Sequence, residues 1–370
     1  MTAQLFTGAS VFDGTRMLPG PLRVEDGTVT GPGPGAAVRL DGGFLAPGFL
    51  DLQVNGAGGR MLDGSCTADW LAGMCDIHAG LGATGILPTL ITDTPEATAR
   101  VLAAGAEAAR RGVPGFLGLH LEGPHLDPRR KGAHDPALIR PMTEADLLAL
   151  LEARARLPSL MVTLAPASAT AGQIARLAGA GVIVSLGHSD CSHAEAEVAI
   201  AAGASCATHL FNAMSQLGNR EPGLVGAALT SPIHAGLIAD GIHVAAPAIR
   251  IAMAASNRLF LVSDAMAPAG SDITEFTLNG RRILRRDGRL TLEDGTLAGA
   301  DLTLPQAVGM MLRLGTPPEV ALAMASSRPA ACLGRSDRLG HLLPGRAADM
   351  VHLGPDGSLR GVWRGGERLR

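Results

Sequence analysis

Eight short apolar runs recur between residues 49 and 266, each bounded by Gly, Pro or polar residues. Runs of this kind, rich in Val, Ile, Leu or Ala, are typical of buried parallel strands. The segments between them carry helix start signals, namely Thr94-Pro95 and the capping-box pairs Thr170/Gln173 and Ser192/Glu195. The eight predicted strands span residues 49–56, 82–92, 115–124, 160–167, 181–189, 206–214, 235–244 and 259–266.

This alternation of strand and helix predicts an α/β fold with a parallel sheet, and eight such units can close into a (β/α)8 TIM barrel. The two ends of the chain differ, because residues 1–48 and 336–370 hold short alternating runs broken by Gly and Pro. Such runs predict antiparallel strands and turns. Neither end can bury a core alone. We therefore predict a small β-sandwich domain from 1–48 plus 336–370, beside a barrel over 49–335.

Composition excludes several classes of partner. A net charge of -3 gives no basic field for nucleic acid or for an anionic membrane. No apolar run approaches the roughly 20 residues that span a bilayer, and the first residues lack the features of a signal peptide. Five cysteines without a CxxC pair fit a reducing compartment. We expect a soluble, cytoplasmic protein.

Four chemically versatile side chains lie at or near the ends of predicted strands: Glu122 in HLEGP, His188 in SLGHS, His209 in ATHLFNAM and Asp264 in LVSDAM. A carboxylate and two imidazoles can hold a divalent metal and leave a position open. A further carboxylate, free of the metal, can serve as a base. Each residue alone is also compatible with a packed or capping role. Four at equivalent strand ends favour a hydrolase.

The first predicted strand ends in Gln53-Val54-Asn55, where many barrel metallohydrolases carry His-x-His and bind a second ion. Amide side chains are poor ligands for zinc-like ions beside imidazole. We therefore predict one divalent metal ion per subunit, with the two amides donating hydrogen bonds or, alternatively, only capping the strand. Zn²⁺ is the expected ion, although the same ligands accept Fe²⁺ or Co²⁺.

Other candidates form a possible anion site. Arg220, in the loop GNREPG, has a guanidinium that can clamp an anion with two hydrogen bonds. Asn212-Ala213 can present backbone N–H groups to the same anion. His243 in ADGIHV and His134 in KGAH occupy loop positions over the barrel mouth. Solvated loops are an equally good explanation of each residue taken alone.

Seven segments in order resemble the motifs of N-acetylglucosamine-6-phosphate deacetylases of the amidohydrolase superfamily: PGFLDLQVNGAGG, GLHLEGPHLDPRRKGAH, SLGHS, ATHLFNAMSQLGNREPGLVGAAL, GLIADGIHV, LVSDAMAPAG and GTLAGADLTL. The resemblance runs from about residue 47 to 304. It implies a (β/α)8 barrel that hydrolyses the acetamide of N-acetylglucosamine 6-phosphate to glucosamine 6-phosphate and acetate, in amino-sugar catabolism or cell-wall recycling.

Site roles also follow from the resemblance. It implies that Glu122, His188 and His209 bind the metal, that Asp264 is the general acid/base, and that His134 polarises the acetyl carbonyl. The counterpart of Arg220 reaches the neighbouring subunit's site, which implies a homodimer. At Ala133 some relatives have a hydroxyl residue; if the substrate contact there is through the backbone little changes, and if it is through the side chain the sugar selectivity differs. The substrate contacts that the resemblance implies are Gln53, Ala133, His134, Asn212, Ala213, Arg220, His243, Leu297, Ala298 and Gly299.

Two other functions compete with this one. A different amidohydrolase, such as a D-aminoacylase or a cyclic amidase without the second metal, has no need of Arg220 together with His243. A barrel that serves only in assembly commonly loses its ligands, whereas the full set and Asp264 are present here.

Overall fold

The computed structural model describes residues 3–370, and its centre is one sheet of eight parallel strands in the order β17-β16-β15-β14-β13-β12-β11-β8. Val54 forms a parallel bridge with Ala265, and the N–H of Asp264 donates to the carbonyl of Gln53 at 3.0 Å, so the two outer strands meet. The predicted (β/α)8 barrel is confirmed. Its strands are β8 (Phe49–Val54), β11 (Ala83–Ile91), β12 (Leu119–Glu122), β13 (Leu160–Leu164), β14 (Ile183–Leu186), β15 (Cys206–Ala207), β16 (His234–Leu237) and β17 (Leu259–Leu261).

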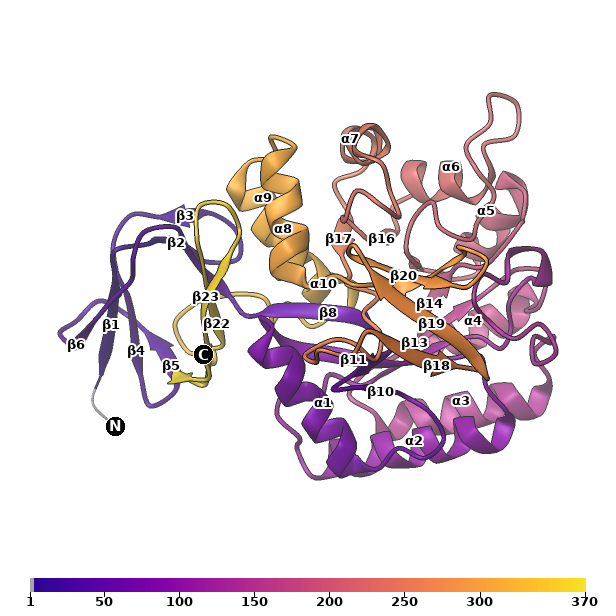
Figure 1. The fold of residues 1–370 in the computed structure, drawn as a ribbon, viewed down its shortest axis with the longest axis horizontal. Helices are drawn as coiled ribbons and strands as arrows, with labels where there is room; N and C mark the ends of the chain where they lie inside the picture. Colours follow the sequence, from indigo (N-terminus) through magenta and orange to yellow (C-terminus); the bar gives the residue numbers. More distant parts are fainter. Residues whose placement is uncertain (1–2) are drawn as a thin grey trace.

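Helices follow the strands and cover the outside of the barrel (Figure 1). Thr94, Thr170 and Ser192 cap three of them as predicted, because each side chain accepts the backbone N–H three residues on. Among residues 3–370, no helix combines the length and the apolar character that crossing a membrane requires. The helices are α1 (Ala68–Gly80), α2 (Pro95–Arg110), α3 (Glu144–Arg156), α4 (Ala171–Gly179), α5 (His193–Ala201), α6 (Gly223–Thr230), α7 (Ala246–Ala255), α8 (Leu304–Arg313), α9 (Pro318–Ala325) and α10 (Ser327–Cys332), with a 3-10 turn at η1 (Pro128–Arg130).

Several strands are shorter than the apolar runs that predicted them. The strands β14, β15 and β17 end at residues 186, 207 and 261, whereas the runs continue to 189, 214 and 266. Two or three residues after each of these strand ends the backbone turns, at His188, His209 and Asp264, whose φ angles are 44°, 30° and 50°. An L-residue in this left-handed region cannot continue a strand. The chain therefore turns at these three residues, at the carboxyl end of the barrel.

A four-stranded antiparallel sheet, β18 (Glu275–Leu278), β19 (Arg281–Arg286), β20 (Arg289–Leu292) and β21 (Leu297–Ala300), is inserted between β17 and α8 and was not predicted. In Figure 1 its strands lie across the barrel. Ile283 and Leu278 pack in one apolar cluster with Met266, which follows β17. The two-residue turns Asn279-Gly280 and Asp287-Gly288, all at positive φ, are the signal that would have revealed these hairpins.

Both chain ends form the sheets beside the barrel, at the left of Figure 1. Strand β7 pairs antiparallel with β22, which joins the amino-terminal segment to the carboxyl-terminal one. The expectation of purely antiparallel pairing was wrong, because β1 pairs parallel with β6 and β2 with β7. The hairpin β4–β5 lies between β1 and β6 in the chain and lets them run in one direction. The predicted domain limits, 1–48 plus 336–370 and 49–335, remain a proposal that this pairing supports.

The strands of this region are β1 (Gln4–Thr7), β2 (Ser10–Phe12), β3 (Met17–Leu18), β4 (Leu22–Glu25), β5 (Thr28–Thr30), β6 (Ala36–Arg39), β7 (Phe44–Pro47), β22 (Met350–Leu353), β23 (Leu359–Arg364) and β24 (Glu367–Arg368). A short hairpin of β9 (Gly56–Ala57) and β10 (Arg60–Met61) follows β8 at the barrel mouth.

Candidate active site

Three of the predicted side chains converge at the carboxyl end of the barrel. Oε1 of Glu122, at the end of β12, lies 3.0 Å from Nε2 of His188 and 2.9 Å from Nε2 of His209. The two Nε2 atoms lie 3.0 Å apart. All three side chains are buried. The turns at His188 and His209 thus bring two imidazoles and one carboxylate, from three strands, to a single point.

The protonation of His188 shows what this point can hold. Its Nδ1 lies 2.9 Å from the carbonyl of Arg130, and a carbonyl only accepts, so Nδ1 carries the proton. The lone pair of Nε2 therefore faces Glu122 and His209. Lone pairs that face one another repel, and a cation bound between them removes this repulsion. Two imidazoles and one carboxylate are a typical ligand set of catalytic zinc. The residues present fit one divalent metal ion.

Electrostatics favour the same role for Glu122. Burial acts to raise the pKa of this carboxyl group, but a positive charge beside it, whether on the imidazoles of His188 and His209 or on a cation between them, holds the pKa well below its usual value. The group is therefore an anion at neutral pH, as a metal ligand must be.

The predicted base, Asp264, is held by the two amides of the first strand. Gln53 Nε2 lies 3.1 Å from Oε1 of Glu122 and 3.2 Å from Oδ1 of Asp264, so it donates to both carboxylates. Asn55 Nδ2 donates to the same Oδ1 at 2.7 Å. Burial, together with the charge of Glu122, raises the pKa of Asp264 to about 6. Two neighbouring carboxyls with pKa values shifted in opposite directions are the pattern of separate ligand and acid/base roles.

His134 faces the cluster as a neutral hydrogen-bond donor. The backbone N–H of Thr92 donates to its Nδ1 at 3.3 Å, and Thr92 Oγ1 lies 2.8 Å from the same nitrogen. Because an N–H can only donate, the ring proton is on Nε2. Burial and the nearby His188 lower the pKa of His134 to about 3, so the ring is uncharged at neutral pH. The ring centroids of His134 and His188 are 4.3 Å apart.

A cavity of about 170 Å³ opens above these residues. Among its walls are Ile91, Ile238, Met266 and Leu278, apolar residues that the sequence did not indicate. Gly299 has a φ of 65°, and a side chain there would collide with Met266. The cavity contains eleven of the predicted site residues: Glu122, Ala133, His134, His188, His209, Asn212, Ala213, His243, Asp264, Leu297 and Gly299.

Three predicted residues lie outside this cavity lining. Gln53 is buried below the cavity, and its side-chain amide donates to Glu122 and Asp264, which line the cavity. Ala298 lies on β21 of the inserted sheet and is buried in the apolar cluster with Met266. Arg220 is exposed on the loop before α6. The roles of these three residues as substrate contacts remain predictions. The roles of the eleven predicted residues that line the cavity remain predictions as well.

Two supporting residues were missed. Asp240 lies three residues before His243, and its Oδ2 is 2.6 Å from His243 Nδ1. The spacing within ADGIHV was the available signal. The second residue is Arg281 of the inserted sheet, whose guanidinium donates to the carbonyl of Ala133. Asp240 fixes the His243 ring, whereas Arg281 ties the loop of His134 to the inserted sheet.

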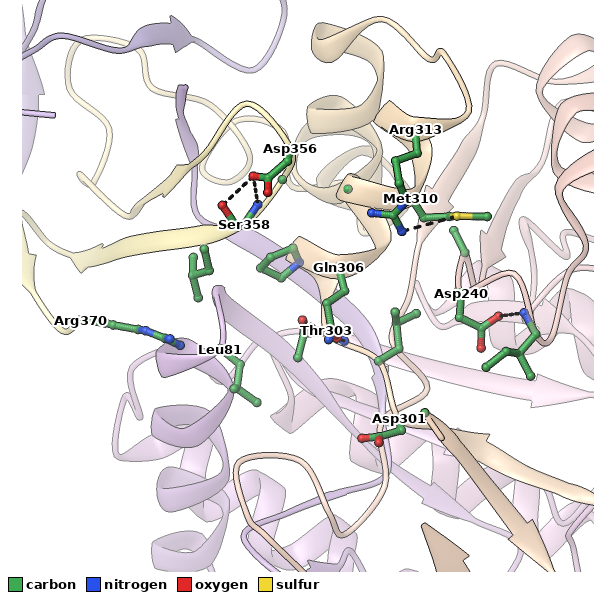
Figure 2. Close-up of a pocket in the computed structure, with 18 residues that line it drawn as sticks. Leu81, Asp240, Asp301, Thr303, Gln306, Met310, Arg313, Asp356, Ser358 and Arg370 are labelled. Atoms are coloured by element: carbon green, nitrogen blue, oxygen red, sulfur yellow. Dashed lines mark hydrogen bonds between the residues drawn. The ribbon is translucent and has the colours of Figure 1, made fainter. Parts of the chain in front are cut away.

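Asp240 also borders a second cavity, of about 520 Å³, between α8 and the turn before β23. Figure 2 shows it with Asp301, Arg313 and Asp356 around it, and with the hydrogen bond from the Ile242 N–H to Asp240. Its acidic groups are already paired, Asp301 with Arg285 and Asp356 with a serine in its own turn. None of the predicted site residues lines this cavity, and we assign no ligand to it.

A (β/α)8 barrel with a Glu/His/His cluster and a separate aspartate at its strand ends is the architecture of a metal-dependent hydrolase. The sequence matches the model of the Amidohydrolase family over residues 44–369, and the chain belongs to that family. The predicted resemblance is thereby confirmed at the level of the family and of the enzyme class.

Individual relatives are more specific. The chain is 42% identical to the N-acetylgalactosamine-6-phosphate deacetylase of Shewanella sp. (strain ANA-3), over 90% of this chain and 84% of that protein. It superposes on the N-acetylglucosamine-6-phosphate deacetylase of Pasteurella multocida with a TM-score of 0.94, 33% identity and 99% coverage of each chain. A variant of the Mycobacterium smegmatis enzyme in complex with N-acetyl-D-glucosamine-6-phosphate gives a TM-score of 0.91, at 31% identity and 100% coverage of both chains.

Proposed function

We propose that this amidohydrolase removes the acetyl group of N-acetyl-D-glucosamine 6-phosphate and releases D-glucosamine 6-phosphate and acetate. The observation that carries the proposal is full-length similarity to an enzyme crystallised with that sugar phosphate. The convergence of Glu122, His188 and His209 beside a separate Asp264 supports it, because amide hydrolysis needs an activated water and an acid for the leaving amine. Amino-sugar catabolism or cell-wall recycling is the context that we propose.

Each residue of the site has a separate role in the proposed reaction. Glu122, His188 and His209 would hold a divalent ion, which would supply Lewis acidity and lower the pKa of water at the site. Asp264 takes a proton from the attacking water as the new C–O bond forms. The same carboxyl returns that proton to the amine nitrogen as the C–N bond breaks. His134 Nε2–H donates a hydrogen bond to the acetyl oxygen, where negative charge develops.

N-acetyl-D-galactosamine 6-phosphate is a second candidate substrate, since the Shewanella relative at 42% identity carries that name. The two sugars differ only in the configuration of one ring hydroxyl, at C4. The acetamide and the phosphate are common to both, so the same catalytic groups would serve either substrate. Selectivity would depend on the cavity wall that faces the sugar ring.

We expect the purified protein to release acetate from at least one of these two sugar phosphates. The measurement compares kcat/KM for both sugars with kcat/KM for N-acetyl-D-amino acids. Faster turnover of the amino acids would instead identify a D-aminoacylase and overturn the proposal. Failure on all three, with metal bound, would leave only the family assignment.

We further expect about one equivalent of divalent metal per chain, because Gln53 and Asn55 offer amides in place of a second pair of imidazoles. Zn²⁺ is the proposed ion, with Fe²⁺ or Co²⁺ as substitutes. Elemental analysis after dialysis measures the stoichiometry. His188→Ala or His209→Ala should lose metal and activity together. A second equivalent that persists in the wild-type protein would contradict the prediction of a single ion.

We also propose a homodimer in which Arg220 serves the neighbouring site. Arg220 is exposed and outside its own chain's cavity lining, and Leu217 in the same loop is 54% exposed. A loop that presents an apolar side chain and a guanidinium together is suited to a partner surface. A cytoplasmic location is proposed as well, with support from the five free cysteines.

A further inference from the structure

Beneath the candidate metal ligands, the centre of the barrel holds a chain of polar side chains where apolar packing is the norm for such barrels. Ser185 Oγ lies 2.6 Å from Thr208 Oγ1, and Thr208 Oγ1 lies 2.6 Å from Thr163 Oγ1. Thr163 Oγ1 lies 2.7 Å from Nε2 of His120. All four side chains are buried. We call this set the hydroxyl chain.

The direction of every link in the hydroxyl chain is determined by one end. His120 Nδ1 lies 3.1 Å from the carbonyl of Leu52, which can only accept, so Nδ1 carries the ring proton. Thr89, also near Nδ1, already uses its hydroxyl proton on the carbonyl of Leu87. A neutral imidazole has one ring proton, so with Nδ1 protonated the Nε2 of His120 accepts from Thr163.

The rest follows because each hydroxyl has a single proton. Thr163 must donate to His120, Thr208 must then donate to Thr163, and Ser185 must donate to Thr208. The hydrogen bonds therefore all point one way, toward β8, and no proton on the chain lacks an acceptor. A buried network that is satisfied in this manner is rigid, whereas one with a missing member carries the cost of an unpaired buried group.

Three of the four members lie on segments that carry a candidate metal ligand, and the fourth, Thr163, lies on β13 between β12 and β14. His120 is two residues before Glu122 on β12, Thr208 directly precedes His209, and Ser185 is three residues before His188. His188 and His209 have left-handed backbones, which persist only where the surroundings hold them. Lateral hydrogen bonds directly below these turns provide such a hold.

We propose that the hydroxyl chain is a positioning element for the metal site, with Thr208 as its central residue. It acts through the backbones of Glu122, His188 and His209, fixing the spacing of their donor atoms, and touches neither substrate nor metal. This inference rests on the proposed metal site. If the hydroxyl chain positions the ligands, the affinity for the ion is set partly by hydroxyl groups that are not ligands themselves.

The test is Thr208→Val, which keeps the branched shape but removes the hydroxyl, so that Ser185 loses its acceptor and Thr163 its donor. Loss of groups that orient metal ligands typically weakens affinity roughly 10–100-fold. We expect that weakening for Zn²⁺ alone, measured by competition with a chromophoric chelator, and a changed absorption spectrum of the Co²⁺-substituted protein. Thr208→Ser, which restores the hydroxyl, should bind within about threefold of the wild type.

Thr84→Val is the matched control, because Thr84 is buried on β11 and takes no part in the hydroxyl chain. It should leave Zn²⁺ affinity unchanged. If Thr208→Val fails to fold, Ser185→Ala removes only the terminal donor and should weaken binding in the same direction. Wild-type affinity in Thr208→Val, or in a folded Ser185→Ala when Thr208→Val cannot be measured, overturns the inference. No Zn²⁺ binding by the wild-type protein would instead refute the proposed metal site.

Discussion

Asp264→Asn is expected to lower kcat by roughly 10²–10⁴-fold while the protein keeps its metal. An amide cannot accept the proton of the attacking water, and it cannot return a proton to the departing amine. The substituted side chain would keep approximately the shape of the aspartate, and Asp264 is not among the three converging ligands. The measurement is steady-state turnover of the sugar phosphate, with elemental analysis of the same sample.

The pH dependence provides an independent check on this role. The base must be ionised to act, so the rate should fall as the pH drops through the pKa of Asp264. Burial and Glu122 raise that pKa to about 6 in the chain alone, and a nearby cation acts in the opposite direction. We expect the acid limb at or below about pH 6, and we expect it to be absent from the residual activity of Asp264→Asn.

Asp272→Asn is the matched control, since Asp272 is an exposed aspartate on the loop that follows. It should retain wild-type turnover. A near-wild-type rate in Asp264→Asn would mean that another group is the base. Loss of metal from Asp264→Asn would mean that Asp264 acts as a ligand as well.

Removing the phosphate from the substrate is expected to lower kcat/KM by at least about 10²-fold, because charge-assisted hydrogen bonds are worth roughly 1.5–3 kcal/mol each. Binding energy from the remote phosphate can hold the acetamide in place, so kcat should fall along with affinity. The comparison is between N-acetylglucosamine 6-phosphate and free N-acetylglucosamine. Equal activity on the two would refute the sugar-phosphate proposal.

Arg220→Ala should erase much of this preference for the phosphorylated sugar and leave metal content unchanged. Arg39→Ala, at an exposed arginine on β6, is the control and should have no effect. If Arg220 crosses a dimer interface, mixing Arg220→Ala with Asp264→Asn protomers should restore activity. In each mixed dimer, one site would regain both residues. No rescue despite proven subunit exchange would place Arg220 in the site of its own chain.

The barrel could be predicted from the sequence because its signals are local. Apolar runs of strand length and the caps at Thr94, Thr170 and Ser192 each depend on a few neighbouring residues. The inserted sheet β18–β21 was missed although its Asn-Gly and Asp-Gly turns are equally local. The parallel pairing of β1 with β6 could not be foreseen, because strand partners across a hairpin are chosen by packing rather than by pattern.

The sequence alone determined which side chains stand at the strand ends, since Glu122, His188, His209 and Asp264 each follow an apolar run. It could not give their spacing. The convergence of two imidazoles and a carboxylate within 3.0 Å depends on barrel closure and on the left-handed turns at His188 and His209. No local sequence pattern predicts these turns. The proton positions on His188, His134 and His120 depend on carbonyl and N–H groups 42–68 residues away in the chain. The sequence specifies which functional groups are present at the strand ends. The distances between these groups and the positions of the ring protons depend on strands that are remote in the chain and become neighbours only in the folded barrel.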